Sequence, residues 1–187
     1  MKIFIPLFLL MAFSLPQSLV AKTVLSLGSF LHRSEIIPKG STSTVNSRNY
    51  FTTLGLHHQL ASGISIGIKG GYRQLLDASN QKTTTSFVGL SLGFLKNNWF
   101  GNATYLGVLP PEKTFTSAAS TITHSGDGGY IWELGYLFST GWGELGPSLY
   151  YSELSYIEQS IDGQETTSFT PVTEKNIHPM IQMMFFL

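Results

Sequence analysis

The sequence predicts an all-β protein, an eight-stranded antiparallel up-and-down transmembrane β-barrel. Three observations lead there: apolar residues alternate with polar or glycine residues in segment after segment, the final segment has one wholly apolar face, and short connections alternate with longer ones. Charged residues make up 12% of the 187 positions, about half the ~25% of an average globular chain. Low charge with apolarity at every second position is typical of strands that face lipid.

The N-terminal region predicts a secretory signal peptide. A positively charged start is followed by an almost continuous apolar run at 3–15, and Ala21 offers a small residue for cleavage. The apolar run is too short to cross a bilayer as a helix. We therefore expect a signal peptide at 1–21 and one barrel domain at 22–187, with a retained helical anchor as the alternative.

Each strand is predicted from alternation of period two, because a strand points successive side chains to opposite faces. The clearest case is 64–74, where Ser65, Lys69 and Arg73 lie opposite an apolar face. In chain order, the apolar faces are Leu25, Leu27 and Leu31 in 23–32; Tyr50, Leu54, Leu56 and Leu60 in 49–60; Ile64, Ile66, Ile68 and Tyr72 in 64–74; Val88, Leu90, Leu92 and Phe94 in 83–95; Tyr130, Trp132, Leu134, Tyr136 and Phe138 in 129–139; and Ile177, Ile181, Met183, Phe185 and Leu187 in 175–187. Two further strands are predicted as the arms that return after tight turns, at 99–109 and 145–154.

The connections between these strands alternate in length. The short ones are 61–63, 96–98 and 140–144, and the longer ones are about 33–48, 75–82, 110–128 and 155–174. By the layout of outer-membrane barrels, the short turns and both termini face the periplasm and the longer loops face the exterior. Serine- and threonine-rich stretches at 40–44 and 114–123 predict solvated surface loops, which suit adhesion, phage or host contact, or surface cover alone.

The last strand is expected to close the barrel against the first. Its outward face ends on Ile181, Met183, Phe185 and Leu187. This ending resembles the C-terminal strand of bacterial outer-membrane proteins, which their assembly machinery reads. We therefore expect a Gram-negative outer-membrane location, with outer-membrane lipid, lipopolysaccharide and that machinery as partners.

Aromatic residues gather at two predicted heights on the barrel. Those near the short-turn end are Phe94, Trp99, Phe138, Trp142 and Phe185, and those near the loop end are Tyr50, Tyr72, Tyr130 and Tyr151. Two aromatic belts mark the two interfaces of a membrane, where an amphipathic ring gains from both phases. The alternative, the core of a soluble sandwich, does not explain the two heights.

The opposite face of the strands is small and polar. An eight-stranded barrel has room inside for side chains but not for an open channel, so general porin activity is not expected. Lys69 and Glu133 point inward at similar heights, and a buried charge needs a partner. We expect an interior network of Lys69, Arg73 and Glu133, with His57 or Gln59 as further members. A structural plug is the favoured role, and a gate or proton path is the alternative.

The strand count, the alternation, the last strand and the aromatic belts together resemble the OmpA transmembrane domain and OmpX-like family of eight-stranded barrels. The resemblance covers the whole of 22–187 and is architectural, since no family-specific motif is present. It implies an integral outer-membrane protein with a structural or surface-interaction role, which we expect to be a monomer. An extracellular ligand of the loops is not identified by the sequence.

No catalytic, cofactor or metal site is predicted, and we expect no enzyme. His124 and Ser125 adjoin in a glycine-rich stretch and Glu133 follows, but the His-any-Ser-Asn pattern of barrels that deacylate lipid A is absent. His57 and His58 are neighbours on a strand and point to opposite faces, so they cannot hold one metal together. A lipid A-modifying outer-membrane enzyme stays open as an alternative.

Charge and polarity bear on nucleic-acid binding and on a soluble carrier function. The net charge is zero, which gives no sign of nucleic-acid binding. A secreted lipocalin-like carrier of a small apolar ligand is the second alternative, and it would turn its apolar face inward. Its outer face would then consist mostly of glycine and serine with few charges, which is poorly soluble.

Overall fold

The computed structural model describes residues 22–36, 45–60, 63–76, 81–117 and 119–187. The predicted signal peptide lies outside these ranges, as do the loop stretch at 40–44 and most of the turn at 61–63. Across the described ranges, no helix is long and apolar enough to span a membrane.

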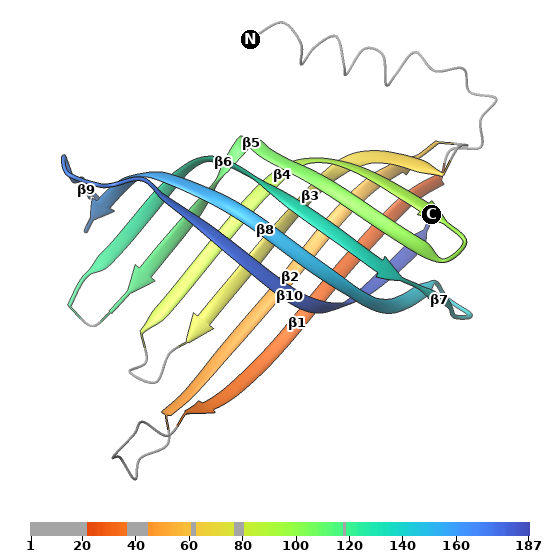
Figure 1. Ribbon diagram of the computed structural model, residues 1–187, viewed down its shortest axis with the longest axis horizontal. Helices are drawn as coiled ribbons and strands as arrows, with labels where there is room; N and C mark the ends of the chain where they lie inside the picture. The colour runs from red at the N-terminus through yellow and green to blue at the C-terminus, as the bar shows by residue number, and fades with distance from the viewer. Residues whose placement is uncertain (1–21, 37–44, 61–62, 77–80, 118) are drawn as a thin grey trace, which may run out of the picture.

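The described residues form one closed antiparallel β-barrel (Figure 1). The strands are β1 (Lys22–Ile36), β2 (Val45–Gln59), β3 (Ile64–Leu76), β4 (Lys82–Lys96), β5 (Trp99–Thr116), β6 (Thr121–Tyr136), β7 (Phe138–Ser139), β8 (Glu144–Ile161), β9 (Gln164–Glu165) and β10 (Val172–Phe186). Each long strand pairs with its neighbour in sequence, and β10 pairs with both β8 and β1. The short β7 and β9 each pair with one end of β8. Among the described residues, eight long strands thus close the barrel, which confirms the predicted fold class.

The strands are strongly tilted in the barrel wall. One line of register partners runs through Lys175, Glu153, Tyr130, Tyr105, Leu90, Ile68, Leu56, Leu25 and Phe185. The line leaves β10 at position 175 and returns to it at position 185, a shear of ten residues. With a rise of ~3.3 Å and a strand spacing of ~4.8 Å, that shear over eight strands gives a tilt of about 40°. A barrel of this geometry is filled by side chains.

The strands extend further toward the loop end than the sequence predicted. β5 reaches Thr116 and β6 begins at Thr121, so the segment 110–128 is mostly strand and not loop. Likewise β8 continues to Ile161 and β10 begins at Val172, which shortens the predicted loop at 155–174. The alternation of apolar residues is lost in these segments, yet threonine, common there, still favours strands.

Two consecutive prolines directly follow the predicted end of the fifth strand. Pro110 and Pro111 cannot donate ladder hydrogen bonds. They lie in a bulge of β5, where the pairing with β6 skips from Tyr105–Tyr130 to Glu112–Ser125. A bulge lets a strand absorb such residues and continue, so the prolines bend the wall here without ending it.

The described tight turns have the backbone conformations that their residues favour. Asn97 and Asn98 have φ of 51° and 69°, and Gly63 has φ of 81°. Asparagine and glycine tolerate positive φ, and two consecutive residues of this kind make a two-residue hairpin that matches the twist of the strands. The prediction of a tight turn between β4 and β5 is therefore confirmed.

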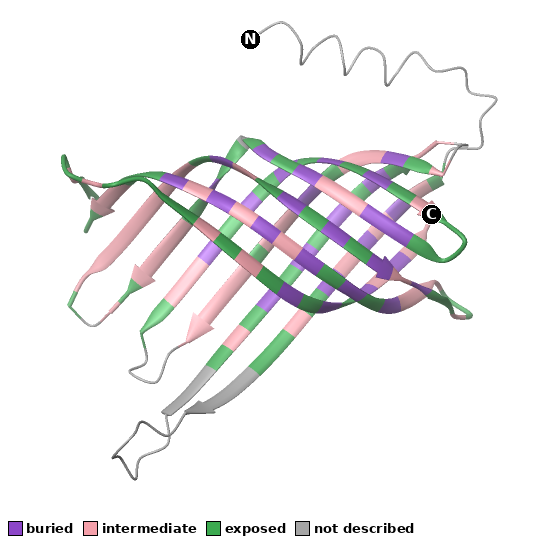
Figure 2. Cartoon of the chain, in the orientation of Figure 1, coloured by how far each residue is buried: buried purple, intermediate pink, exposed green. Residues whose placement is uncertain are grey.

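Buried and exposed residues alternate along the strands, as the bands in Figure 2 show, and the two faces of the barrel wall differ in polarity. Exposed apolar and aromatic side chains cover the outer face, among them Leu54, Leu56, Ile68, Leu90, Leu92, Trp132, Leu134, Leu149, Ile177 and Ile181. Buried polar side chains lie on the inner face, among them Ser26, Thr53, Ser65, Lys69, Ser91, Glu133, Ser148 and Gln182. This polarity is the reverse of that of a soluble barrel with an apolar interior.

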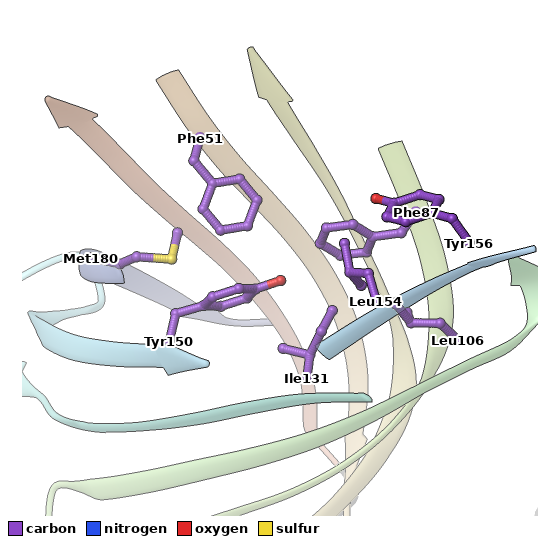
Figure 3. Packing of buried hydrophobic residues seen from close by; sticks show 8 residues of the cluster. All are labelled: Phe51, Phe87, Leu106, Ile131, Tyr150, Leu154, Tyr156 and Met180. Carbon is purple, nitrogen blue, oxygen red and sulfur yellow. The ribbon is translucent and has the colours of Figure 1, made fainter. Parts of the chain in front are cut away.

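Large apolar side chains also enter the interior, in two groups. The group near the short turns consists of Val24, Phe100, Leu137 and Met184. The larger group, shown in Figure 3, consists of Phe51, Phe87, Leu106, Ile131, Tyr150, Leu154, Tyr156 and Met180. Inward glycines make room for these rings, since a Cβ at Gly71 would collide with Phe87 and one at Gly135 with Phe100. The interior is thus built from alternating large and small side chains, where the sequence predicted mainly small polar ones.

Candidate functional site: two charge clusters inside the barrel

The first cluster is a buried ion pair between Lys69 of β3 and Glu133 of β6. The ammonium group of Lys69 contacts Oε2 of Glu133, and each side chain is only 1% exposed. The hydroxyl of Ser148 donates to Oε1 of Glu133 over 3.1 Å. Both carboxylate oxygens therefore have partners, which a buried charge requires. We name Lys69, Glu133 and Ser148 the central cluster.

The second cluster lies further toward the loop end and joins four strands. Arg73 of β3 donates through Nη1 to Oε1 of Glu174 on β10, over 3.1 Å. Lys113 of β5 contacts the other carboxylate oxygen of Glu174. Arg73 also donates from Nη1 to Asn176 over 3.1 Å and from Nε to Asn49 over 3.3 Å. We name these five residues the mouth cluster.

Arg73 therefore belongs to a different cluster from the one predicted for it. Lys69 and Arg73 are four residues apart on β3 and both point inward, which separates them by ~13 Å along the strand. Gly71 lies between them and pairs with Phe87 of β4, whose ring fills the space at that height. The predicted network is thus split into two by an apolar layer. His57 is buried but makes no hydrogen bond to Lys69 or Glu133, and Gln59 is only partly buried.

Glu174 is the residue that the sequence analysis missed in the mouth cluster. Burial alone would raise the pKa of its carboxyl group. The hydrogen bonds from Lys113 and Asn176, together with the positive charges of Lys113 and Arg73, outweigh that effect and hold the pKa below its usual value. The carboxylate is therefore ionised at neutral pH and faces two cations.

Aromatic rings surround Lys113 in the mouth cluster. Its ammonium nitrogen lies 4.9 Å from the ring centre of Phe115 and 6.0 Å from that of Tyr156, within the range of a cation–π contact. His124 packs 5.0 Å from Phe115 and 4.9 Å from Phe169, measured between ring centres. Burial, and next the charge of Lys113, lower the pKa of His124, while Glu174 acts in the opposite direction.

Two small cavities lie inside the described part of the barrel, and a wider, open hollow of about 390 Å³ lies at its short-turn end, lined by Gln59, Asn98 and Glu144 among others. A cavity of about 20 Å³ lies near the short turns, bordered by Val24, His57 and Phe100 among others. Another, of about 30 Å³, lies in the mouth cluster and is lined by Arg73, Leu75, Thr83, Thr85, Lys113 and Glu174. The two small volumes hold one to a few water molecules each, so neither is a passage for a larger solute.

The structure places the predicted aromatic residues on the outer face of the wall. Tyr50, Tyr72, Phe94, Trp99, Tyr130, Phe138 and Trp142 are exposed, and Tyr151 and Phe185 are partly exposed. Tyr105, Trp132 and Tyr136 lie on the same face; Trp132 and Tyr136 were predicted on the apolar face of their strand but not assigned to a belt, and Tyr105 was not predicted. Ring contacts join several of them, including Trp142 to Phe185 at 5.6 Å and Tyr105 to Tyr130 at 5.5 Å between centres. The last strand presents Ile181 and Leu187 outward, with Met183 partly exposed.

The residues considered for lipid chemistry do not come together. His124 and Glu133 are nine positions apart on β6, about 30 Å along an extended strand, and Glu133 is held by Lys69 and Ser148. The ring nitrogen Nε2 of His124 contacts the side chain of Gln159 at 3.3 Å. Within the described residues, no three side chains of the metal-binding types form a cluster.

Comparison with known proteins adds little to this description. No protein-family model matches the chain, and no curated protein matches it. Among solved structures, it is similar to an outer membrane channel from Pseudomonas putida F1, with 11% sequence identity, a TM-score of 0.30, and coverage of 93% of this chain and 97% of that one. At this TM-score the similarity carries no weight for fold or role. The resemblance to OmpA and OmpX-like barrels therefore stays a prediction.

Proposed function

We propose that this protein is an integral outer-membrane β-barrel with a structural or surface-interaction role and a closed interior. The observation that carries this proposal is the inverted polarity of the wall. Exposed leucine, isoleucine and aromatic side chains cover the outside, while an ion pair that is 1% exposed lies inside. Lipid is the solvent that favours such an outer face, and a closed barrel satisfies all of its wall hydrogen bonds in lipid.

The height of the apolar surface fits a bilayer. On β3, Ile64 near the short turns and Tyr72 near the loop end are both exposed and eight residues apart. Eight residues extend ~26 Å along the strand and about 20 Å along the barrel axis at the tilt of this barrel. Outer-membrane barrels have an apolar band ~25 Å tall between aromatic girdles. The two groups of aromatic side chains on the outer face match the edges of such a band.

The orientation and partners of the barrel follow from this proposal. The short turns and both ends of the barrel chain lie in the periplasm, and the longer connections face the exterior, as in other barrels of this class. The apolar face of β10, with Ile181 and Phe185, is the surface that the assembly machinery would read. Outer-membrane lipid and lipopolysaccharide surround a monomer whose extracellular ligand, where there is one, contacts the loop end.

The alternatives are less well supported by the geometry. A lipocalin-like carrier needs an apolar cavity, whereas the described interior holds two ion-pair clusters. A lipid A-modifying enzyme of the deacylase type needs its histidine, serine and carboxylate within hydrogen-bond reach. His124 and Glu133 are far apart and have other partners.

Cell fractionation and gel mobility test the proposal together. We expect the mature protein in the outer-membrane fraction and a change of its mobility in SDS gels after boiling, because a closed barrel resists SDS until heated. Leu134→Arg is the comparison variant. It puts a charge on the proposed lipid face and should reduce the amount of the folded, heat-modifiable form. Recovery of the wild type in the soluble periplasmic fraction would contradict the membrane assignment. A large, steady conductance in planar bilayers would contradict the closed interior.

A further inference from the structure

The mouth cluster carries more positive than negative charge. Arg73 and Lys113 both contact the single carboxylate of Glu174. The charged residues next to them in sequence, Glu112 and Lys175, alternate to the outer face of the wall and do not balance the excess. From this imbalance and the cavity beside it we propose that Arg73 and Lys113 bind the carboxylate group of a small aliphatic acid at the loop end of the barrel.

The cavity in the mouth cluster presents cationic and hydroxyl groups that suit a carboxylate. Its volume of about 30 Å³, room for one to a few water molecules, is bordered by Arg73, Lys113, Thr83 and Thr85, and also by Leu75 and Glu174. The guanidinium group offers a planar fork of donors that matches a carboxylate, and the ammonium group adds a second positive charge. The cluster is half-sheltered, since the side chains of Arg73 and Glu174 are 19% and 20% exposed. An anion is therefore attracted more strongly than in open water, and can still enter.

The aromatic surroundings favour an organic acid over a mineral anion. Phe115, Tyr156 and Phe169 lie around Lys113 and His124. Phe169 belongs to the connection between β9 and β10, is only partly buried, and packs against the large interior group. A ligand with a short apolar chain and a carboxylate would pack against these rings.

A substitution of Glu174 distinguishes ligand binding by the mouth cluster from a purely structural role. Its carboxylate already occupies one side of Arg73 and Lys113, so it competes with an incoming anion. Replacing it by glutamine keeps the shape and raises the net charge of the cluster from one positive charge to two. If the three residues only tied β3, β5 and β10 together, this change would weaken the barrel and create no affinity.

Isothermal titration calorimetry tests the site: sodium butyrate is titrated into the purified barrel in phospholipid nanodiscs, and empty nanodiscs serve as the blank. We expect saturable heat with the wild type and about tenfold tighter binding by Glu174→Gln, because one repulsive charge within a few ångströms is removed. Arg73→Met and Lys113→Met should each abolish the signal. Lys175→Met is the matched control, since Lys175 is 61% exposed and pairs with Glu153 on the outer face at 3.3 Å. It should bind butyrate as the wild type does.

Two results would overturn the proposal. One is the absence of saturable butyrate heat from both the wild type and Glu174→Gln, provided that both show the heat-modifiable mobility of a folded barrel. The other is equal competition by sodium chloride at matched concentration, which would show a site for any anion and not for a carboxylate. Because every sample is a folded barrel in a defined membrane, neither result bears on the cellular location proposed above.

Discussion

The central cluster and the mouth cluster use the same chemistry in opposite settings. Lys69 and Glu133 are one cation and one anion, each 1% exposed. Arg73, Lys113 and Glu174 are two cations and one anion, each about a fifth exposed. The first cluster is balanced and sealed, whereas the second is unbalanced and reached by water. The comparison shows that one narrow barrel holds both a sealed ion pair, in the central cluster, and an accessible one that can exchange partners, in the mouth cluster.

The apolar layer between the clusters keeps them independent. Phe51 pairs with Arg73 and Phe87 pairs with Gly71, so rings fill the barrel at the height between the two ion pairs. Phe51 also packs edge-on to Tyr150, with ring centres 4.7 Å apart. Charges that are separated by such a layer and have their own partners contribute additively to stability. Each cluster can therefore be tested without disturbing the other.

The largest effect is expected from breaking the central pair on one side only. Lys69→Met or Glu133→Gln alone leaves a buried group without its partner, which costs roughly 3–5 kcal/mol of unfolding free energy. The double variant should be much closer to the wild type, because neither charge is left unpaired. Urea unfolding of the barrel in lipid vesicles measures all four proteins of this cycle. Strict additivity of the two single changes would show that the residues are not coupled.

The next largest effect concerns the residue beside Glu133 in sequence. Leu134 points outward and is 51% exposed. Leu134→Arg should cost about 2–4 kcal/mol if the residue lies near the middle of the membrane, although a charge is tolerated one position earlier on the inner face. Folding yield into vesicles and urea unfolding measure this cost. Ser139→Arg, at the short-turn end of the wall, serves as the control, and an equal cost for both would argue against a lipid-facing Leu134.

The wall of the barrel could be predicted from the sequence where apolar residues alternate with polar residues or glycine. Leucine, isoleucine and aromatic residues at every second position fixed the outward face of β3, β4 and β6, and the tight turns fixed the order of the strands. The same rule predicted that Lys69 and Glu133 both face inward at one height. The structure joins them directly.

The signal fails where the wall leaves the apolar band. In the parts of β5 and β6 toward the loop end, threonine and serine occur without alternation, and they were interpreted as loop. The partner of Arg73 was missed for the same reason. Glu174 lies in a segment that was assigned to a loop, whereas β10 in fact begins at Val172 and turns Glu174 inward. The contact between Arg73 on β3 and Glu174 on β10 crosses the interior of the barrel. It depends on closure of the barrel, which a local sequence pattern does not specify.

A smaller effect is expected when salt is added. The coupling between Arg73 and Glu174, measured by single and double changes to methionine and glutamine, should be at most about 1 kcal/mol at low ionic strength. It should fall toward zero at ~1 M salt, where the screening length is ~3 Å. The coupling between Lys69 and Glu133 should change little, because no water reaches that pair. Equal salt dependence of both couplings would show that the two settings do not differ as described.

The smallest effect is expected from the pH dependence of the mouth cluster. Its cations hold the pKa of Glu174 below the usual value of 4.5. A carboxyl group whose pKa is lower in the folded state binds fewer protons there than in the unfolded state, so it contributes stability above its unfolded pKa and loses that contribution as the pH falls through its folded pKa. The wild type should therefore exceed Glu174→Gln in stability at about pH 7, and the difference should shrink as the pH falls from about 4.5 to about 3. Urea midpoints of the two proteins across this range measure the difference, in which the contributions of all other carboxyl groups cancel. A difference that stays constant down to pH 3 would show that Glu174 does not gain its stability from Arg73 and Lys113.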